Sequence, residues 1–325
     1  MEGRLTSLEI CAGAGGQALG LEMAGFEHTA LVEIDEHACR TLRLNRPHWN
    51  VIQADLREFS ARPYEGVDLL AGGVPCPPFS RAGQQMGELD ERDLFPTALR
   101  LVEECRPKAV MLENVKGLVS AKFAYYRAMV DSRLQELGYV SQWRLLHAAD
   151  FGVPQLRPRA ICVALKAEDV ARFRWPVPLP DARRSVGEAL FQQMASSGWE
   201  GAMYWALHAD GIAPTLVGGS KKHGGPDLGP TQARAAWAAL GVDGGTLADE
   251  PPGPGFTGRP RLTVQMAAIV QGFPDGWRFF GRKTAAYRQV GNAFPPPVAA
   301  AVARQIMDAL QTRSFASAQA VPAYA

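Results

Sequence analysis

The sequence lacks the features that would place the chain in a membrane or in an oxidising compartment. No apolar run approaches the roughly 18–20 residues that span a bilayer, and the opening MEGRLTSLEI has neither the apolar core nor the cleavage site of a secretory signal. The five cysteines are odd in number, widely scattered and without a C-x-x-C pair. We therefore expect no disulfide framework, no metal site, and a cytoplasmic protein with reduced thiols.

A large charge of either sign is also missing. The 34 Lys and Arg residues and the 33 Asp and Glu residues give a formal net charge of +1, which neither indicates nor excludes a nucleic-acid partner. The first 172 residues are slightly acidic and the remainder slightly basic, so the second part is the better candidate for contact with a polyanion. The 325 residues, 47% of them hydrophobic, suffice for one large domain or two modest ones.

Short apolar runs alternate with amphipathic stretches over the first 170 residues. This alternation predicts βαβ units and a mostly parallel, doubly wound α/β sheet. The expected strands are 5–10, 28–34, 51–54, 67–71, 108–113, 140–147 and 160–165, and the expected helices between them are 17–24, 36–45, 94–105 and 125–137.

The composition changes at about residue 185, where glycine and proline multiply and the alternation is lost. This stretch is too long for a linker and contains Trp199, Trp205 and Trp237, which indicates a second, smaller, loop-rich domain. Two more helices are expected, at 262–271 and 297–310. We predict domains at residues 1–184 and 185–284, with a C-terminal segment, 285–325, that returns to the first domain.

A glycine turn separates the first expected strand from the first expected helix. Gly13-x-Gly15-x-x-Ala18 occupies the turn, and Glu33 lies twenty residues after Gly13, at the end of the second expected strand. This spacing is typical of a nucleoside site, in which the backbone approaches the ligand closely and the carboxylate binds ribose hydroxyls. NAD enzymes and sulfonium-dependent methyltransferases share it, and a tight turn without a ligand is the alternative.

Three further loops carry reactive side chains. Cys76 lies between two prolines after the strand at 67–71, which predicts a fixed, exposed thiol and the best nucleophile of the five cysteines, although a packed loop cysteine is the alternative. Glu113 ends another strand, and Arg157 and Arg159 precede the strand at 160–165. We expect these loops to converge at one edge of the sheet, beside the nucleoside pocket.

The complete set of motifs resembles that of the bacterial C5-cytosine-specific DNA methyltransferases of restriction–modification systems. The motifs occur in the order of that family and cover the chain apart from its variable segment. They are residues 9–16 (EICAGAGG), 75–80 (PCPPFS), 113–115 (ENV), 155–159 (QLRPR), 271–275 (QGFPD) and 289–298 (QVGNAFPPPV).

The resemblance implies a Rossmann-like domain that binds S-adenosylmethionine, and a smaller target recognition domain. The implied activity is that of a DNA (cytosine-5-)-methyltransferase acting on a cytosine flipped out of a specific duplex site. In the family, the thiolate corresponding to Cys76 attacks carbon 6 of the base, and Glu113 binds the N3/N4 edge and shares a proton with N3. Arg159 would hold O2, and Arg157 would support the loop or a phosphate.

The resemblance also assigns cofactor and DNA contacts. Glu33 would hold the ribose, Ile34 would stack on adenine, and Asp55, with Leu56 beside it, would accept the adenine amino group. Cys11 stands where the family commonly has phenylalanine. The remaining cofactor contacts are Ala12, Gly13, Gly15, Gly16, Pro75, Leu94 and Asn292, and the expected DNA contacts in the catalytic domain are Ser80, Arg81, Gln84 and Gln155. The expected product is S-adenosylhomocysteine.

The variable segment, about Ser196–Gly258, resembles the target recognition domain. Residues 213–216 (APTL) match the family's Thr-Leu signature, and the expected DNA contacts are Thr215, Ser220, Lys221, Lys222 and His223. A solvated turn is an equal alternative for the last four. Expected partners are double-stranded DNA and a cognate restriction endonuclease that acts on the same site without a stable complex, the protein itself being a monomer that binds no membrane.

Three competing functions use parts of the same pattern. A tRNA cytosine-5 methyltransferase shares the cofactor fold and the cysteine chemistry, but the long variable segment favours duplex DNA. A catalytically inactive DNA-binding regulator would not need intact Cys76, Glu113 and Arg159. An NAD oxidoreductase explains the glycine turn and leaves Cys76 without a role.

Overall fold

The computed structural model describes residues 4–75, 93–219 and 224–318. A seven-stranded sheet forms the larger part of the molecule, in the order β3-β2-β1-β4-β5-β7-β6. All neighbours pair in parallel except β7, which runs antiparallel to both β5 and β6. The strands are β1 (Thr6–Ile10), β2 (Glu27–Glu33), β3 (Val51–Gln53), β4 (Leu69–Gly73), β5 (Ala109–Val115), β6 (Tyr139–His147) and β7 (Pro158–Lys166). The doubly wound α/β fold predicted from the sequence is confirmed.

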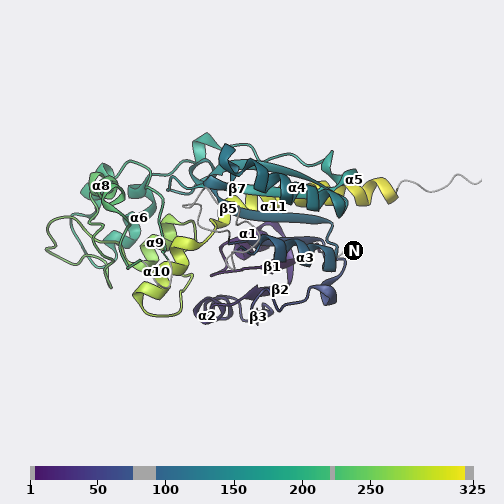
Figure 1. The fold of residues 1–325 in the computed structure, drawn as a ribbon. Coiled ribbons are helices and arrows are strands. Elements are labelled where there is room, and N and C mark those ends of the chain that lie inside the picture. The colour runs from purple at the N-terminus through teal and green to yellow at the C-terminus, as the bar shows by residue number, and fades with distance from the viewer. Residues whose placement is uncertain (1–3, 76–92, 220–223, 319–325) are drawn as a thin grey trace, which may run out of the picture.

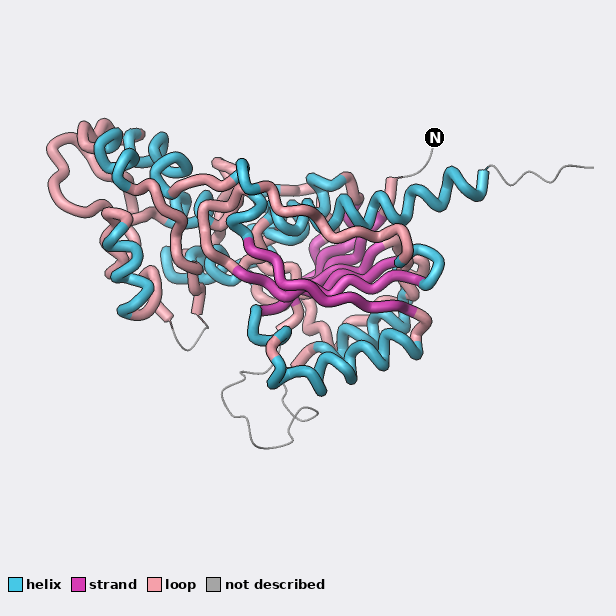
Figure 2. The backbone as a smooth tube through the Cα atoms, turned by 90° about the horizontal axis from the view of Figure 1, so that it is seen from above, coloured by secondary structure: helices cyan, strands magenta, loops and turns pink. Residues whose placement is uncertain are grey.

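Helices cover both faces of this sheet (Figure 2). The first and last long helices, α1 (Gly16–Ala24) and α11 (Pro296–Ala318), pack together on one face, and α3 (Phe95–Cys105) and α4 (Ala124–Glu136) pack on the other. Central strands therefore bury both of their faces, as Leu69 and Leu70 of β4 do in opposite core clusters.

Gly20 lets α1 and α11 approach closely. A Cβ atom at residue 20 would lie 2.4 Å from the Cβ of Ala299 and 2.6 Å from the carbonyl oxygen of Pro296. Only glycine fits at such a backbone contact. The α1–α11 pair is thus fixed by one position on the first helix, and it covers the sheet residues Leu69, Ala71 and Ile161.

The second part of the molecule is a small helical domain beside the sheet (Figure 1). It is more helical than the sequence predicts, because α6, α7 and α8 lie in the stretch expected to be loop-rich. Ser185 and Glu188 form a reciprocal capping box that starts α6, a local signal that the glycine and proline content obscured. Its helices are α6 (Val186–Ala195), α7 (Ala202–His208), α8 (Thr231–Ala239) and α9 (Val264–Val270).

The two parts share one continuous core. Trp205 and Trp237 of the small domain belong to the same buried cluster as Leu42 of α2 (Glu36–Asn45), and Trp49 contacts Trp277 with ring centroids 6.2 Å apart. The small domain is therefore packed against the sheet domain rather than connected to it by a linker.

The chain returns to the sheet domain through α10 (Lys283–Asn292) and α11. The predicted boundary between residues 284 and 285 falls inside α10. That helix contacts α2, where the Thr41 hydroxyl donates to the Gln289 side chain over 2.6 Å. The remaining elements are short: α5 (Ala167–Val170) and the 3-10 turns Arg62–Tyr64, Lys116–Val119, Ala121–Phe123, Ala148–Phe151 and Pro180–Ala182. Within the described ranges, no helix combines the length and apolar character needed to cross a bilayer.

Candidate active site

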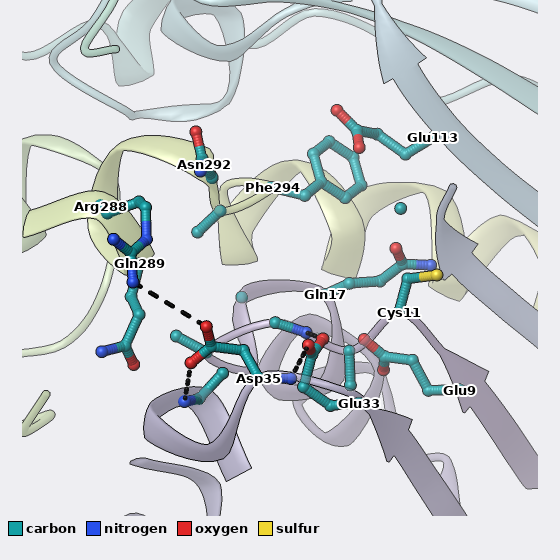
Figure 3. A pocket seen from close by; sticks show the side chains of 17 residues that line it. Glu9, Cys11, Gln17, Glu33, Asp35, Glu113, Arg288, Gln289, Asn292 and Phe294 are labelled. Carbon is teal, nitrogen blue, oxygen red and sulfur yellow. Dashed lines mark hydrogen bonds and ion pairs between the residues drawn. The ribbon is translucent and has the colours of Figure 1, made fainter. Parts of the chain in front are cut away.

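A cavity of about 200 Å³ lies at the carboxyl ends of the parallel strands (Figure 3). The glycine turn after β1 forms one wall and the end of α10 forms the opposite wall, as expected for a ligand site in a doubly wound sheet. It is lined by Glu9, Cys11, Ala12, Gly13, Ala14, Gly16, Gln17, Glu33, Asp35, Ala38, Gly73, Glu113, Arg288, Gln289, Asn292, Ala293 and Phe294.

Glu33 ties the end of β2 to the glycine turn. Its carboxylate accepts hydrogen bonds from the backbone N–H groups of Gly13 and Asp35, each over 2.7 Å. Gly13 has a φ of 54° and no atom within 4 Å of the position that a Cβ would take, so the open side of the turn faces space that a ligand could fill. The spacing of Gly13 and Glu33 in the sequence thus corresponds to a direct contact.

Two buried side chains in the cavity have polar atoms without a partner among the described residues. Glu9 is 1% exposed and one of its carboxyl oxygens makes no hydrogen bond; Gln17 is 4% exposed and neither end of its amide makes one. Burial raises the pKa of Glu9 well above its usual range, and burial raises the pKa of Glu33 as well. Buried polar groups of this kind indicate a site completed by a ligand.

The cofactor contacts expected from the sequence divide into two groups. Cys11, Ala12, Gly13, Gly16, Glu33 and Asn292 line the cavity. Gly15 instead caps α1 with a φ of 87°, Ile34 is 60% exposed, and the carboxylate of Asp55 pairs with Arg57 over 2.6 Å. Leu56, Pro75 and Leu94 also do not border the cavity.

Glu113 and Arg159 form an ion pair at the rim of the cavity. Antiparallel pairing of β5 and β7 sets Val115 opposite Arg159, and the Arg159 Nε atom lies 2.7 Å from a Glu113 carboxylate oxygen. Each side chain is 11% exposed. Burial raises the pKa of Glu113, although Arg159 and Arg157 act in the opposite direction. The predicted convergence of these strand ends is therefore observed for Glu113 and Arg159.

Arg157 and Gln155 lie in the interior and do not border the cavity. Arg157 is 1% exposed, and its guanidinium donates to the carbonyl oxygens of Leu216, Gly291 and Ala293 over 2.7–2.9 Å, which corresponds to the loop-supporting alternative of the two expected for it. Gln155 is fully buried and donates to the Gln271 side chain over 2.8 Å, and its expected contact with DNA stays a prediction. Both residues hold the small domain and the segment before α11 against β7.

Asn292, the last residue of α10, connects the small domain to the cavity wall. The Asn292 side-chain amide donates to the carbonyl oxygen of Gly219 over 3.1 Å, and Asn292 itself lines the cavity. Thr215, an expected DNA contact, is partly exposed and its hydroxyl donates to the Leu156 carbonyl oxygen. The segment that precedes residue 220 is therefore attached to the wall of the pocket.

Several predicted residues lie outside the described part of the chain. They are Cys76, Ser80, Arg81, Gln84, Ser220, Lys221, Lys222 and His223. The four described cysteines all have raised thiol pKa values, chiefly through burial: Cys39 to about 11 and Cys105 to about 12, with Cys11 and Cys162 raised as well. None of these four is activated as a nucleophile.

Sequence reasoning missed ten residues of the cavity wall: Glu9, Ala14, Gln17, Asp35, Ala38, Gly73, Arg288, Gln289, Ala293 and Phe294. Glu9 could have been found, because a carboxylate inside an apolar strand is costly unless it serves a site. A guanidinium nitrogen of Arg288 lies 3.8 Å from a carboxylate oxygen of Asp35. The two residues are 253 positions apart in the sequence, so no local sequence pattern predicts this contact. Among the residues the structure describes, no cluster of His, Cys, Asp or Glu could hold a metal ion.

The strand order, the glycine turn and the carboxylate of Glu33 at the end of β2 together define the class: a doubly wound, Rossmann-like fold with a nucleoside-type site. A variant of the DNMT2 of Spodoptera frugiperda has the same fold, with a TM-score of 0.66, 18% identity, and coverage of 93% of this chain and 99% of that one. The chain belongs to the C-5 cytosine-specific DNA methylase family, whose model matches residues 5–207 and 244–308.

Relatives of high identity are type II methyltransferases. M.NgoMIV of Neisseria gonorrhoeae is 56% identical over 311 residues, which are 95% of this chain and 99% of the relative. M.NaeI of Lentzea aerocolonigenes is 57% identical over 312 residues, 94% of this chain and 75% of the relative. The chain is thus a cytosine-5 DNA methyltransferase of the type found in restriction–modification systems, and the NAD oxidoreductase alternative is set aside.

Proposed function

We propose that the protein transfers a methyl group from S-adenosylmethionine to carbon 5 of a cytosine flipped out of a specific duplex DNA site, through a covalent bond between Cys76 and carbon 6 of the base. The observation that supports this proposal most directly is the buried Glu113–Arg159 pair at the rim of a carboxyl-lined nucleoside pocket. The pair offers what a cytosine ring requires: a group that exchanges a proton with N3 and a fixed cation beside it.

The pocket fits a cationic nucleoside better than a dinucleotide. Among the residues that the structure describes, its wall carries the carboxyl groups of Glu9, Glu33, Asp35 and Glu113 and one guanidinium, that of Arg288. A pyrophosphate would meet like charge there, whereas a sulfonium and an ammonium group would be attracted. The unpartnered atoms of Glu9 and Gln17 are suited to an ammonium or carboxylate group. Glu33, next to the turn, would hold the ribose.

The protein's own groups prepare the base for methylation. Because burial raises the pKa of Glu113, its carboxyl group can carry the proton that N3 needs as charge develops on the ring. Arg159 keeps the Glu113 carboxyl group in one orientation and offers its remaining N–H groups to O2 of the base. Both groups lie in a largely water-excluded position, where such interactions are strongest.

The proposed covalent mechanism needs no reagent other than the enzyme, the DNA and S-adenosylmethionine. The Cys76 sulfur forms a bond to carbon 6, the electron pair of the C5–C6 double bond moves to carbon 5, and N3 gains the proton from Glu113. When bound, S-adenosylmethionine supplies an electrophilic methyl group at its sulfonium centre. A base then removes the proton from carbon 5, the carbon–sulfur bond breaks, and N3 returns its proton to Glu113, so that the Cys76 thiolate, the Glu113 carboxyl group and the C5–C6 double bond are restored.

We further propose that this methylation protects host DNA from a restriction endonuclease that cuts the same site, and that the methyltransferase acts as a monomer without a stable complex with that enzyme. The type II relatives support the first point. The second is proposed because one polypeptide holds both the carboxyl-lined pocket and the base-binding pair, so that the proposed chemistry requires no second subunit.

Label transfer tests the proposal. Purified protein is incubated with S-adenosylmethionine labelled in the methyl group and with either unmethylated duplex DNA or tRNA. Label should enter DNA as 5-methylcytosine, at one site that bisulfite sequencing identifies. Label in tRNA alone would make the chain an RNA enzyme, and absence of label from both would indicate an inactive DNA-binding regulator.

A trapped adduct tests the covalent step. Duplex DNA with 5-fluorocytosine at the target cannot lose a proton from carbon 5 after methyl transfer, so the carbon–sulfur bond should persist. Peptide mass mapping should find this adduct on Cys76. An adduct on Cys11, Cys39, Cys105 or Cys162, or none despite label transfer into ordinary DNA, would contradict the proposed mechanism.

Binding of S-adenosylmethionine should tighten as the pH rises toward and through the raised pKa of Glu9. Burial raises the pKa of Glu9, and a bound cation favours the ionised carboxylate, so binding releases a proton and is favoured at higher pH. The slope should not exceed about tenfold per pH unit for one proton. Titration calorimetry with Glu9→Gln should give a flatter pH dependence, and the exposed control Glu27→Gln should follow the wild type. An unchanged slope in Glu9→Gln would remove Glu9 from cofactor binding.

A further inference from the structure

A backbone hydrogen bond joins the two chain segments that flank residues 76–92. We call these segments, residues 74–75 and 93–94, the stem. The Leu94 N–H donates to the carbonyl oxygen of Pro75 over 3.2 Å. On the Pro75 side, the buried Asn114 of β5 donates its side-chain amide to the carbonyl oxygen of Val74 over 2.7 Å. Pro75 is bonded to Cys76, so the position of this stem sets where the chain carrying Cys76 begins.

A tyrosine on the neighbouring helix fixes the other side of the stem. The Tyr126 hydroxyl of α4 donates to the Asp93 carboxylate, whose two oxygens both lie 2.7 Å from it. The same carboxylate accepts the Phe95 N–H over 3.0 Å at the start of α3. The Tyr126 ring packs edge-on against Phe95 with centroids 5.7 Å apart. One hydroxyl thus joins α4, the first turn of α3 and the stem.

We infer that Tyr126 and Asp93 act as positioning residues for the methylation step, by holding the Asp93–Leu94 side of the stem against Pro75. This inference rests on the proposed covalent role of Cys76. Neither residue lines the carboxyl-rich cavity, whose wall includes Glu113. Their effect is therefore on the placement of the attacking chain rather than on ligand binding.

The expected size of the effect follows from how sharply bond formation depends on placement. A nucleophile must be held about 3–3.5 Å from the carbon it attacks, and a displacement of about 1 Å can cost a hundredfold in rate. Loss of the Tyr126 hydrogen bond alone leaves the Leu94–Pro75 and Asn114–Val74 contacts intact. We therefore expect a smaller loss, about tenfold.

Tyr126→Phe tests the inference, with Tyr125→Phe as the matched control because Tyr125 is 79% exposed on the same turn of α4. The rate of adduct formation with 5-fluorocytosine DNA is measured in a single turnover, together with the Kd of S-adenosylmethionine and the Kd of DNA. In Tyr126→Phe the adduct rate and kcat should fall about tenfold while both Kd values stay within twofold. Tyr125→Phe should match the wild type.

Asp93 variants separate positioning from a general loss of folding. Asp93→Asn retains an oxygen that accepts from Tyr126 and Phe95 and should recover most of the rate. Asp93→Ala should be slow, and adding Tyr126→Phe to it should cause no further loss, since the same bond is already gone. An unchanged rate in Tyr126→Phe, or a rate loss matched by a lower unfolding temperature, would overturn the inference. A wild-type protein that forms no adduct would overturn the proposed function instead.

Discussion

Replacing Glu113 by glutamine should lower kcat for methyl transfer about a thousandfold. The amide keeps the size and most of the hydrogen-bonding ability of the side chain but cannot deliver a proton to N3, and general acid catalysis contributes about 10²–10⁴ in rate. Burial raises the pKa of Glu113, which favours the protonated carboxyl group that this step requires. Single-turnover label transfer into duplex DNA measures the loss.

The pH profile distinguishes this role from a structural one. Because kcat of the wild type depends on a protonated Glu113, it should fall as the pH rises above the pKa of that group, and Glu113→Gln should lose this dependence. Glu136→Gln is the matched control, since Glu136 is exposed in an ion pair with Arg133 on α4. A Glu113→Gln variant that retains a tenth of the wild-type rate would show that the carboxyl group is not the proton donor.

Replacing Arg157 by methionine should lower the free energy of unfolding by about 3 kcal/mol. The change removes the guanidinium donor from the carbonyl oxygens of Leu216, Gly291 and Ala293. The Ala293 oxygen still accepts from the Gln271 side chain, and each buried oxygen left unsatisfied costs about 1–3 kcal/mol. Relief of the desolvated guanidinium offsets part of this cost. Urea denaturation should show the lower midpoint, with Arg62→Met as the exposed control.

Limited proteolysis should show which part of the Arg157→Met variant is destabilised. Since Arg157 joins β7 to the small domain at Leu216, the variant should be cut faster around residues 211–219 under native conditions, while cleavage within the sheet domain stays at the wild-type rate. Equal unfolding midpoints for Arg157→Met and the wild type would mean that the surrounding backbone finds other donors, and that Arg157 is not the link between the parts.

Contacts that follow from local pattern could be predicted from the sequence. The Gly13–Glu33 contact depends only on a strand, a turn and the next parallel strand, so a spacing of twenty residues suffices to predict it. The Glu113–Arg159 pair follows from strand ends that share an edge. The bounds of α1, α2, α3 and α4 were predictable to within about one residue, because glycine and proline near their ends are local signals. The end of α11 was not, since the helix continues to Ala318 and the prediction stopped at residue 310.

Features that depend on packing between distant segments could not be predicted. Gln155 and Arg157 lie in a polar motif that reads as an exposed turn, and their burial results from Leu216, Gln271 and Ala293 closing over them. Helices α6, α7 and α8 were hidden by glycine and proline around them. The contact of Arg288 with Asp35 exists only once α10 has packed against α2.

The pairing of α1 with α11 has a consequence for how the protein is made. During synthesis, α1 leaves the ribosome among the first elements, but its partner follows only after all seven strands and the small domain. Until then Leu69, Ala71 and Ile161 of the sheet and Leu21 of α1 lack the contacts that α11 supplies to their cluster. The sheet must therefore complete its folding late, through contacts between segments far apart in the chain. A polypeptide that ends before α11 would expose this apolar face. Binding by chaperones and degradation by proteases would therefore determine how much of it persists in the cell.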